Sequence, residues 1–261
     1  ARARLTAGQG EVVSLTGEAQ ASLKHVRHAV SILEAAHGTS PGDASIFTEL
    51  CSRRESVADR LAGVGTGAAI DEKEAIRMYG DCRACWSQMA AWPGIADDLR
   101  ARAARADAVI LTKLGNVHMA HERYGQAVER YREARTAISK LGRANRESLL
   151  TIRAQNMILR GEGYALLWSG KPSESLPIIS EGLALSRQLM ARDPLNEQNQ
   201  SATMSLLSAY GDALKATNRG PEATAAWREA EQIGLAMMSK NPANAVAKTR
   251  LDDIRGKLAG K

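Results

Sequence analysis

A pattern of small and aromatic residues that returns about every 48 positions constrains the fold of this chain most strongly. In its clearest copies a glycine, Gly115 or Gly211, is followed by alanine at +12, an aromatic residue at +16 and alanine at +19. Repetition over about 20–50 residues is typical of an array of stacked units that share one core. The small anchors at Gly10, Ala58, Gly115, Gly163 and Gly211 are separated by 48, 57, 48 and 48 residues.

Each repeat predicts a pair of antiparallel α-helices. The residues at +12, +16 and +19 follow i, i+4, i+7 spacing, which places them on one face of the second helix. A small anchor lets the first helix approach closely, and the residue at +16 fills the remaining gap. Alanine, leucine, arginine and glutamate dominate the composition, and all four favour helices. Runs of Val, Ile and Thr that would indicate strands are missing.

Proline-containing segments mark the expected ends of the repeats. Asp193 and Asn241 each precede a proline and are predicted N-caps of the following helices. Residues 65–69 are expected to be a longer inter-helix loop. The last segment predicts one amphipathic capping helix with Val246, Leu251, Ile254 and Leu258 on its apolar face. The predicted organisation is a single array over 1–261, with units at about 1–40, 41–92, 93–143, 144–192 and 193–240 and a capping helix at 241–261.

The repeat is similar to the tetratricopeptide (TPR) consensus, in which Leu-Gly, Ala, an aromatic residue and Ala recur at these offsets. Leu114-Gly115, Ala127, Tyr131 and Ala134 carry this resemblance most clearly. The departure is length, because a TPR unit usually has about 34 residues, and helices of about 20 residues would absorb the difference. The resemblance implies an all-α right-handed solenoid of about five hairpins plus the cap, and a protein-binding scaffold.

The amino-acid sequences of two repeats resemble those of the C-terminal repeats of bacterial serine/threonine protein kinases. The two segments are YGQAVERYREARTAISKL, which begins at Tyr124, and GPEATAAWREAEQIGLAMMSKNPAN, which begins at Gly220. The sequence has no Gly-rich loop with its strand lysine, no His-Arg-Asp loop and no Asp-Phe-Gly motif. The resemblance therefore implies a non-catalytic interaction segment of a signalling kinase, and the chain itself is not expected to be an enzyme.

Positive charge is concentrated in the middle of the chain. Residues 96–170 hold 13 Lys/Arg against 8 Asp/Glu, a net charge of +5. Arg146, Arg153 and Arg160 recur every seven residues and would form one stripe along a helix. Such a stripe is either a solvated helix face or a site for an acidic partner.

The TPR resemblance implies a concave groove lined by the first helix of each unit, in which a peptide or protein is bound. The contact positions of the family, together with the arginine stripe, give ten candidate site residues. They are Thr112, Asn116, Arg153, Asn156, Arg160, Tyr164, Trp168, Ser208, Asp212 and Lys215.

Other motifs point to packing rather than chemistry. Cys82-x-x-Cys85 lacks the second ligand pair of a structural zinc site, and an odd total of three cysteines argues against a disulfide framework. Both cysteines are therefore expected to be buried thiols. His25/His28 and His118/His121 have i, i+3 spacing without the HExxH arrangement. No cofactor and no metal ion are expected.

Alternative functions remain open at this level. The basic middle region is compatible with a nucleic-acid-binding α-solenoid, although aromatics are scarce at 4%. A metal-binding or enzymatic helical protein is the next alternative, and self-association through the array ends is a further one. No apolar run reaches the roughly 20 residues of a membrane span, so this segment is not expected to insert. The sequence leaves the compartment open: the cytoplasm, or outside it if a transmembrane segment precedes Ala1.

Overall fold

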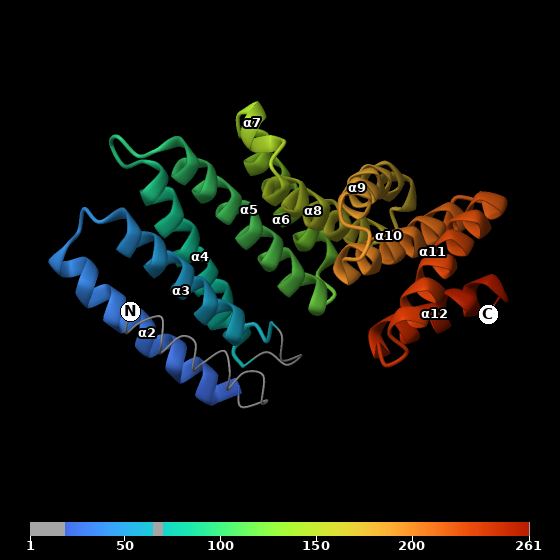
Figure 1. The fold of residues 1–261 in the computed structure, drawn as a ribbon, viewed down its shortest axis with the longest axis horizontal. Helices are drawn as coiled ribbons and strands as arrows, with labels where there is room; N and C mark the ends of the chain where they lie inside the picture. The colour runs from blue at the N-terminus through green and yellow to red at the C-terminus, as the bar shows by residue number, and fades with distance from the viewer. Residues whose placement is uncertain (1–18, 65–69, 261) are drawn as a thin grey trace. The chain divides into compact units, whose positions relative to one another are not determined.

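A computed structural model of the chain describes residues 19–64 and 70–260, and the backbone in these ranges forms α-helices and no β-strand (Figure 1). The predicted all-α fold is thereby confirmed. Most helices have 18 to 24 residues, as the long repeat requires. In chain order they are α2 (Ala19–Thr39), α3 (Ala44–Leu61), α4 (Glu72–Ala90), α5 (Asp97–Ala120), α6 (Tyr124–Ser139), α7 (Arg143–Arg146), α8 (Leu149–Trp168), α9 (Pro172–Arg192), α10 (Glu197–Ala216), α11 (Gly220–Lys240) and α12 (Ala245–Leu258).

The chain divides into two compact units, Ala1–Val117 and His118–Lys261. In the first unit, α2, α3, α4 and α5 contribute to an apolar core. In the second unit, α9, α10, α11 and α12 share another. One continuous array over residues 1–261 stays a prediction. The anchor Gly10 and the loop predicted at 65–69 lie outside the described residues.

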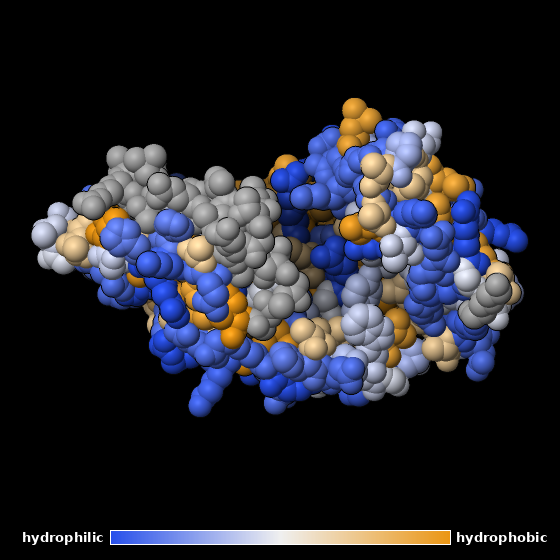
Figure 2. Space-filling model, turned by 90° about the horizontal axis from the view of Figure 1, so that it is seen from below, coloured by the Kyte–Doolittle hydropathy of each residue, from blue (hydrophilic) through white to orange (hydrophobic). Residues whose placement is uncertain are grey.

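The one-face positions predicted from the repeat are confirmed by burial. These positions are buried in all five repeats; they stand at +12, +16 and +19 from the anchor in four repeats and five residues later in the second. The outward sides of the helices carry the polar residues, so hydrophilic atoms make up most of the coloured surface in Figure 2. The buried set is Ser22, Val26 and Ala29; Ala75, Tyr79 and Cys82; Ala127, Tyr131 and Ala134; Ser175, Ile179 and Gly182; and Ala223, Trp227 and Ala230.

At two of the small anchors the partner helix leaves no room for a side chain. A Cβ placed on Gly163 would lie less than 3.0 Å from Ile179, and one placed on Gly211 less than 3.0 Å from Trp227. In both units the overlapping side chain is the residue at +16, so the anchor and the filler are direct partners.

The helix caps lie three residues later than the sequence predicted. Asp193 and Asn241 are the C-terminal caps of α9 and α11, not N-caps. Each begins a tight turn, in which its carbonyl accepts from the N–H of Asn196 (3.3 Å) or Asn244 (3.1 Å). These two asparagines cap α10 and α12. The reason is that the proline occupies the turn between the helices, where its fixed φ is favourable, and not the first turn of the next helix.

The expectation of a buried thiol is confirmed for Cys82 and was wrong for Cys85. Cys51 of α3 and Cys85 of α4 form a disulfide with an S–S distance of 2.03 Å, and Cys82 is a free, buried thiol. Cys85 faces the neighbouring helix of its hairpin, where a cysteine 34 positions earlier lies opposite. An odd number of cysteines excludes complete pairing but allows one bond.

The predicted capping helix is observed as α12, with one correction. Leu251 and Ile254 are buried as expected, and Leu258 packs partly buried against the second core. Val246 is 58% exposed, and Ala247 takes its place at 2%. Since α12 begins only after Asn244, the apolar face is rotated by one residue relative to the prediction.

The described residues contain no helix that is both long and apolar enough to span a bilayer.

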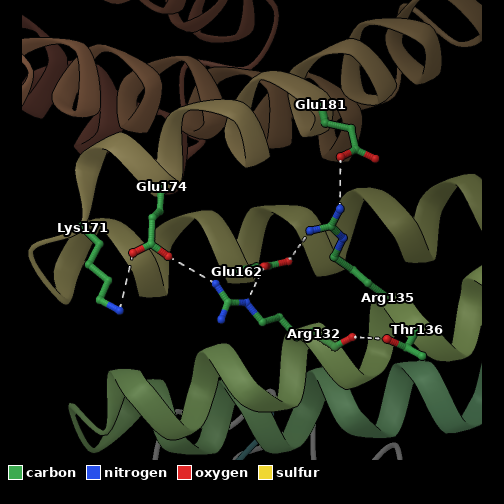
Figure 3. A network of polar contacts seen from close by, with 7 residues as sticks. All are labelled: Arg132, Arg135, Thr136, Glu162, Lys171, Glu174 and Glu181. Atoms are coloured by element: carbon green, nitrogen blue, oxygen red, sulfur yellow. Dashed lines mark hydrogen bonds and ion pairs between the residues drawn. The ribbon is translucent and has the colours of Figure 1, made fainter.

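A buried carboxylate on α8 fixes how that helix sits between its neighbours. Glu162 is 1% exposed and bonds Arg132 at 3.3 Å and Arg135 at 3.1 Å, both from α6. The two guanidinium groups reach onward to α9, to Glu174 at 3.4 Å and Glu181 at 3.5 Å (Figure 3). Charge-assisted hydrogen bonds are directional as well as strong, so this cluster sets the rotation of α8 about its axis.

Replacing the closest anchor should destabilise the second unit. Gly211→Ala forces its methyl group into the Trp227 indole, and such overpacking costs about 1–3 kcal/mol. Gly256→Ala is the control, because a Cβ there meets nothing within 4 Å; it should be neutral or stabilising by up to about 1 kcal/mol. Urea unfolding of both variants measures the difference, and equal stability of Gly211→Ala and wild type would contradict the close approach.

Removing the charge of Glu162 should also lower stability. Glu162→Gln leaves two guanidinium groups facing a neutral amide, and a hydrogen bond to a charged group is worth about 1.5–3 kcal/mol. The matched variant Glu174→Gln changes a carboxylate whose side chain is 51% exposed, so its effect should stay within about 0.5 kcal/mol. Thermal unfolding would count against the proposed role of Glu162 if the two variants melted alike.

Candidate functional site

The predicted site residues fall on three helices. Arg153, Asn156, Arg160, Tyr164 and Trp168 lie on α8, and Ser208, Asp212 and Lys215 on α10; both helices belong to the second unit. The other two lie on α5 in the first unit and are treated apart from these eight.

The two α5 residues differ in exposure. Thr112 is 1% exposed, and its hydroxyl donates to the Ala108 carbonyl at 2.8 Å. Its hydroxyl is therefore already satisfied and faces the interior. Asn116 lies one turn further along α5 and is exposed.

An apolar pocket of about 170 Å³ lies among α8, α10 and α12. Four predicted residues, Tyr164, Trp168, Ser208 and Asp212, line this apolar pocket. The sequence therefore located one real concavity, although α12 was expected only to close the core. The apolar part of its lining consists of Leu167, Met204, Ala209 and Ile254.

The polar side of the apolar pocket is internally neutralised. Lys257 donates to Asp212 at 2.8 Å and to Ser208 at 2.9 Å, and it pairs with Asp253 at 3.0 Å. The second oxygen of Asp212 accepts from the Trp227 indole at 3.2 Å. Burial would lower the pKa of Lys257, but the hydrogen bonds and charges of the two aspartates outweigh it and raise that pKa. These charges fasten α12 to α10, which leaves the apolar lining as the part that can receive a ligand.

An exposed aromatic platform stands beside the apolar pocket. Trp168 is 57% exposed although it is one of the largest apolar side chains of the chain. Its ring stacks on Tyr164, with centroids 5.7 Å apart, and meets the edge of Tyr124 at 6.1 Å. The two tyrosines hold the indole in place, and rigid exposed aromatics of this kind are common anchors at interfaces.

A basic pocket of about 530 Å³ adjoins the apolar pocket. Arg153, Arg160 and Arg250 line it, and Arg250 belongs to both pockets. Among residues 19–64 and 70–260, neither Arg153 nor Arg160 has a hydrogen bond or an ion pair with another residue. Arg250 donates to the carbonyl of Ser201 at 3.3 Å and to its hydroxyl. Glu197, the carboxylate in the lining, faces three guanidinium groups, so the basic pocket is electropositive.

Two other predicted residues have mainly structural contacts. Asn156 is 5% exposed, and its amide donates to the Gly182 carbonyl at 2.8 Å. It therefore joins α8 to α9 at the edge of the basic pocket. Lys215 is exposed, and its ammonium lies 5.6 Å from the centroid of the Trp227 ring, outside the lining of either pocket.

The Glu162 cluster explains why Arg160 and Tyr164 face the groove. In an α-helix, residues two positions apart point in nearly opposite directions, because each residue turns by about 100°. Glu162 is held towards α6 and α9 by its two arginines, as Figure 3 shows. Arg160 and Tyr164 are consequently turned the other way. Burial raises the pKa of Tyr164, while the nearby Arg160 and Arg250 act in the opposite direction.

The first unit carries a different charge pattern on its helices. Lys113 of α5 bonds Glu55 at 2.6 Å and Asp59 at 2.8 Å, both on α3. Tyr79 donates to the same Asp59 at 2.8 Å. Burial acts to lower the pKa of Lys113, but the two carboxylates raise it overall. Lys113 matches one of the two negative charges, so this cluster carries a net charge of −1 and offers no positive charge to an acidic ligand.

The residues of α12 are the part of the site that sequence reasoning missed. Arg250, Ile254 and Lys257 all line a pocket, yet this helix was interpreted only as a cap. A signal was present, because Asn241-Pro242-Ala243-Asn244 repeats the form of Asp193-Pro194-Leu195-Asn196 before α10. A helix introduced by the same turn belongs to the same class as α10 and presents side chains to the same groove.

Within residues 19–64 and 70–260, no group of three or more His, Cys, Asp or Glu side chains is arranged to hold a metal ion.

Comparison with known proteins identifies the fold but no close relative. No protein-family model matches the chain, and no curated protein matches it. Solved structures do match. One crystal structure of nearly identical kinesin light chain-type TPR-like repeats from Podosopora anserina has a TM-score of 0.57 at 13% identity, covering 92% of this chain and 97% of that one. A single-substitution form of the same repeats has a TM-score of 0.58 at 14% identity, covering 91% and 97%. The chain therefore has the TPR-like fold that its repeat predicted.

Proposed function

We propose that the chain is a non-enzymatic protein-interaction scaffold that binds an acidic peptide segment in the groove formed by α8, α10 and α12. The observation that carries this proposal is the basic pocket, with Arg153, Arg160 and Arg250 opposite one carboxylate. An exposed Trp168 lies in the adjoining apolar pocket.

The pairing state of the arginines supports an acidic ligand over a merely solvated face. Four arginines of the basic middle region have carboxylate partners. Among the described residues Arg153 and Arg160 have none, as is also true of Arg102, Arg105 and Arg146, but of these five only Arg153 and Arg160 line the basic pocket. Guanidinium groups bind carboxylates through two parallel hydrogen bonds. The two guanidinium groups on α8, with Arg250 of α12 nearby and partly bonded to Ser201, fit a run of acidic side chains. The paired arginines of the region are Arg100, Arg130, Arg132 and Arg135.

The apolar pocket adds a size limit to the ligand. Its volume of about 170 Å³ is below the roughly 300–1,000 Å³ of small-molecule sites. One apolar side chain of a peptide fits such a volume, with neighbouring acidic residues placed over the basic pocket. A peptide of this kind uses both concavities at once, which neither a metal ion nor a small cofactor would do.

The longer protein to which this chain would belong is proposed from the sequences of the repeats alone. The segments beginning at Tyr124 and Gly220 support a non-catalytic segment of a bacterial signalling serine/threonine kinase. In that setting, peptide binding would bring a partner to the kinase or report its presence.

Charge reversal should remove the acidic preference. A random 12-residue peptide library panned on the wild-type chain should yield peptides enriched in Asp and Glu. Arg153→Glu/Arg160→Glu should lose these peptides, with an affinity loss of about 100-fold if each reversed charge costs about 1.4 kcal/mol. The control Arg192→Glu/Arg228→Glu makes the same charge change at exposed positions outside both pockets and should retain them.

Two results would contradict the acidic groove. One is a selected set without Asp and Glu enrichment, and the other is equal binding by the groove variant and its control. Tight binding of a single-stranded oligonucleotide that weakens steeply with salt would favour the nucleic-acid alternative instead.

Trp168 should be an anchor for binding and not for folding. Trp168→Ala should weaken a selected peptide by about tenfold or more, as expected for a tryptophan hot spot. Its unfolding free energy should change by about 0.5 kcal/mol at most, since the side chain is largely solvated. Leu195→Ala is the matched control, because Leu195 is 74% exposed and lines neither pocket. Calorimetric titration would reject the anchor if both variants bound equally well.

A further inference from the structure

The disulfide of the first unit is a site that the proposed function does not use. It joins Cys51 of α3 to Cys85 of α4 across one helix hairpin. Both residues belong to the apolar core, with Cys51 0% and Cys85 4% exposed. Phe47, Trp86 and Met89 belong to the same core.

We propose that the Cys51–Cys85 bond forms and persists in the cell, and that the chain therefore works in an oxidising compartment. Disulfides persist in such compartments and are rare where glutathione and thioredoxin keep thiols reduced. One consequence rests on the proposed function: the acidic partner would be met outside the reducing cytosol, as a secreted, surface-exposed or periplasmic protein.

The arrangement of the three cysteines favours one defined bond. Cys82 lies one helical turn before Cys85 and is completely buried. Burial first, and then the charges of Glu55 and Asp59, raise the pKa of Cys82 to about 12. Thiol–disulfide exchange requires a thiolate, so Cys82 stays protonated near neutral pH and does not attack the neighbouring bond.

Burial also protects the bond once it has formed. A reducing thiolate must reach one of the two sulfur atoms, and both residues are enclosed by the core. Reduction therefore requires α3 and α4 to separate first. The bond in turn restricts that separation, because it closes a loop between residues 34 positions apart.

Formation of the bond needs an oxidant, which we take to be the disulfide of a thiol oxidoreductase or oxidised glutathione. The Cys51 and Cys85 thiols together lose two protons and two electrons and form one S–S bond. The oxidant disulfide accepts those electrons and protons and leaves as two thiols. This exchange must precede closure of the core, since the sulfur atoms are inaccessible afterwards.

Thiol trapping in the cell of origin tests the proposal directly. Cells are quenched in acid, and denatured protein is alkylated with a maleimide before and after reduction, then mapped by mass spectrometry. We expect Cys82 to be labelled before reduction, and Cys51 and Cys85 only afterwards. Labelling of all three cysteines before reduction would overturn the proposal. The readout does not involve the groove, so its failure is separate from any failure of peptide binding.

Melting of the purified full chain gives the second test. Reduction should lower the melting temperature of wild type by about 10 °C. Cys82→Ala, which retains the bond, should show the same dependence on reductant, whereas Cys51→Ala/Cys85→Ala should show none. A wild-type melting temperature that is unchanged by complete reduction would overturn the structural role of the bond. The comparison of oxidised and reduced wild type stands even if the double variant does not fold.

Discussion

The close approach of paired helices at the small anchors is the contact on which the rest of the second unit depends. Gly163 and Gly211 leave room for Ile179 and Trp227, the residues at +16, where a Cβ would overlap them. In each helix pair the backbone at the anchor packs directly against the side chain at +16. This contact is possible only where the anchor residue is small. The two contacts lie 48 residues apart, at equivalent positions of successive repeats. The first helices of these repeats, α8 and α10, therefore turn equivalent faces towards the groove.

The apolar face of α8 packs against neighbouring helices. Its polar side chains fall into two groups, those that point towards other helices and those that point into the groove. Glu162 is turned to α6 and α9 and is bonded there, whereas Arg160, two residues earlier, lines the basic pocket and has no hydrogen bond or ion pair with any described residue. Burying a carboxylate is costly unless charged donors surround it. The two arginines of α6 offset this cost by bonding Glu162, so they are not available to a ligand. The arginines of the basic pocket are not used in this way by the packing of α8.

Repeat spacing was enough to predict the fold and the three buried positions on the second helix of each repeat, because these depend only on helix geometry within one repeat. The site was predicted less completely. Tyr164 and Trp168, predicted from their repeat positions, line the apolar pocket, whereas Arg250, which lines both pockets, was not predicted because α12 had been interpreted as a cap. The disulfide could not be predicted from the sequence for a different reason. Whether Cys51 faces Cys85 depends on how α3 and α4 are rotated against each other, and a count of cysteines contains no such information.

The charged clusters of the two units and the basic pocket differ in how much of their charge is matched. In the first unit, Lys113 lies between Glu55 and Asp59, so its positive charge is matched and one negative charge of the cluster is left over. In the second unit, Glu162 is matched by two arginines. Within the described residues, Arg153 and Arg160 have no carboxylate partner, which leaves their hydrogen-bonding capacity available. It is their position beside the exposed Trp168, and not the absence of a partner alone, that supports the proposed ligand site.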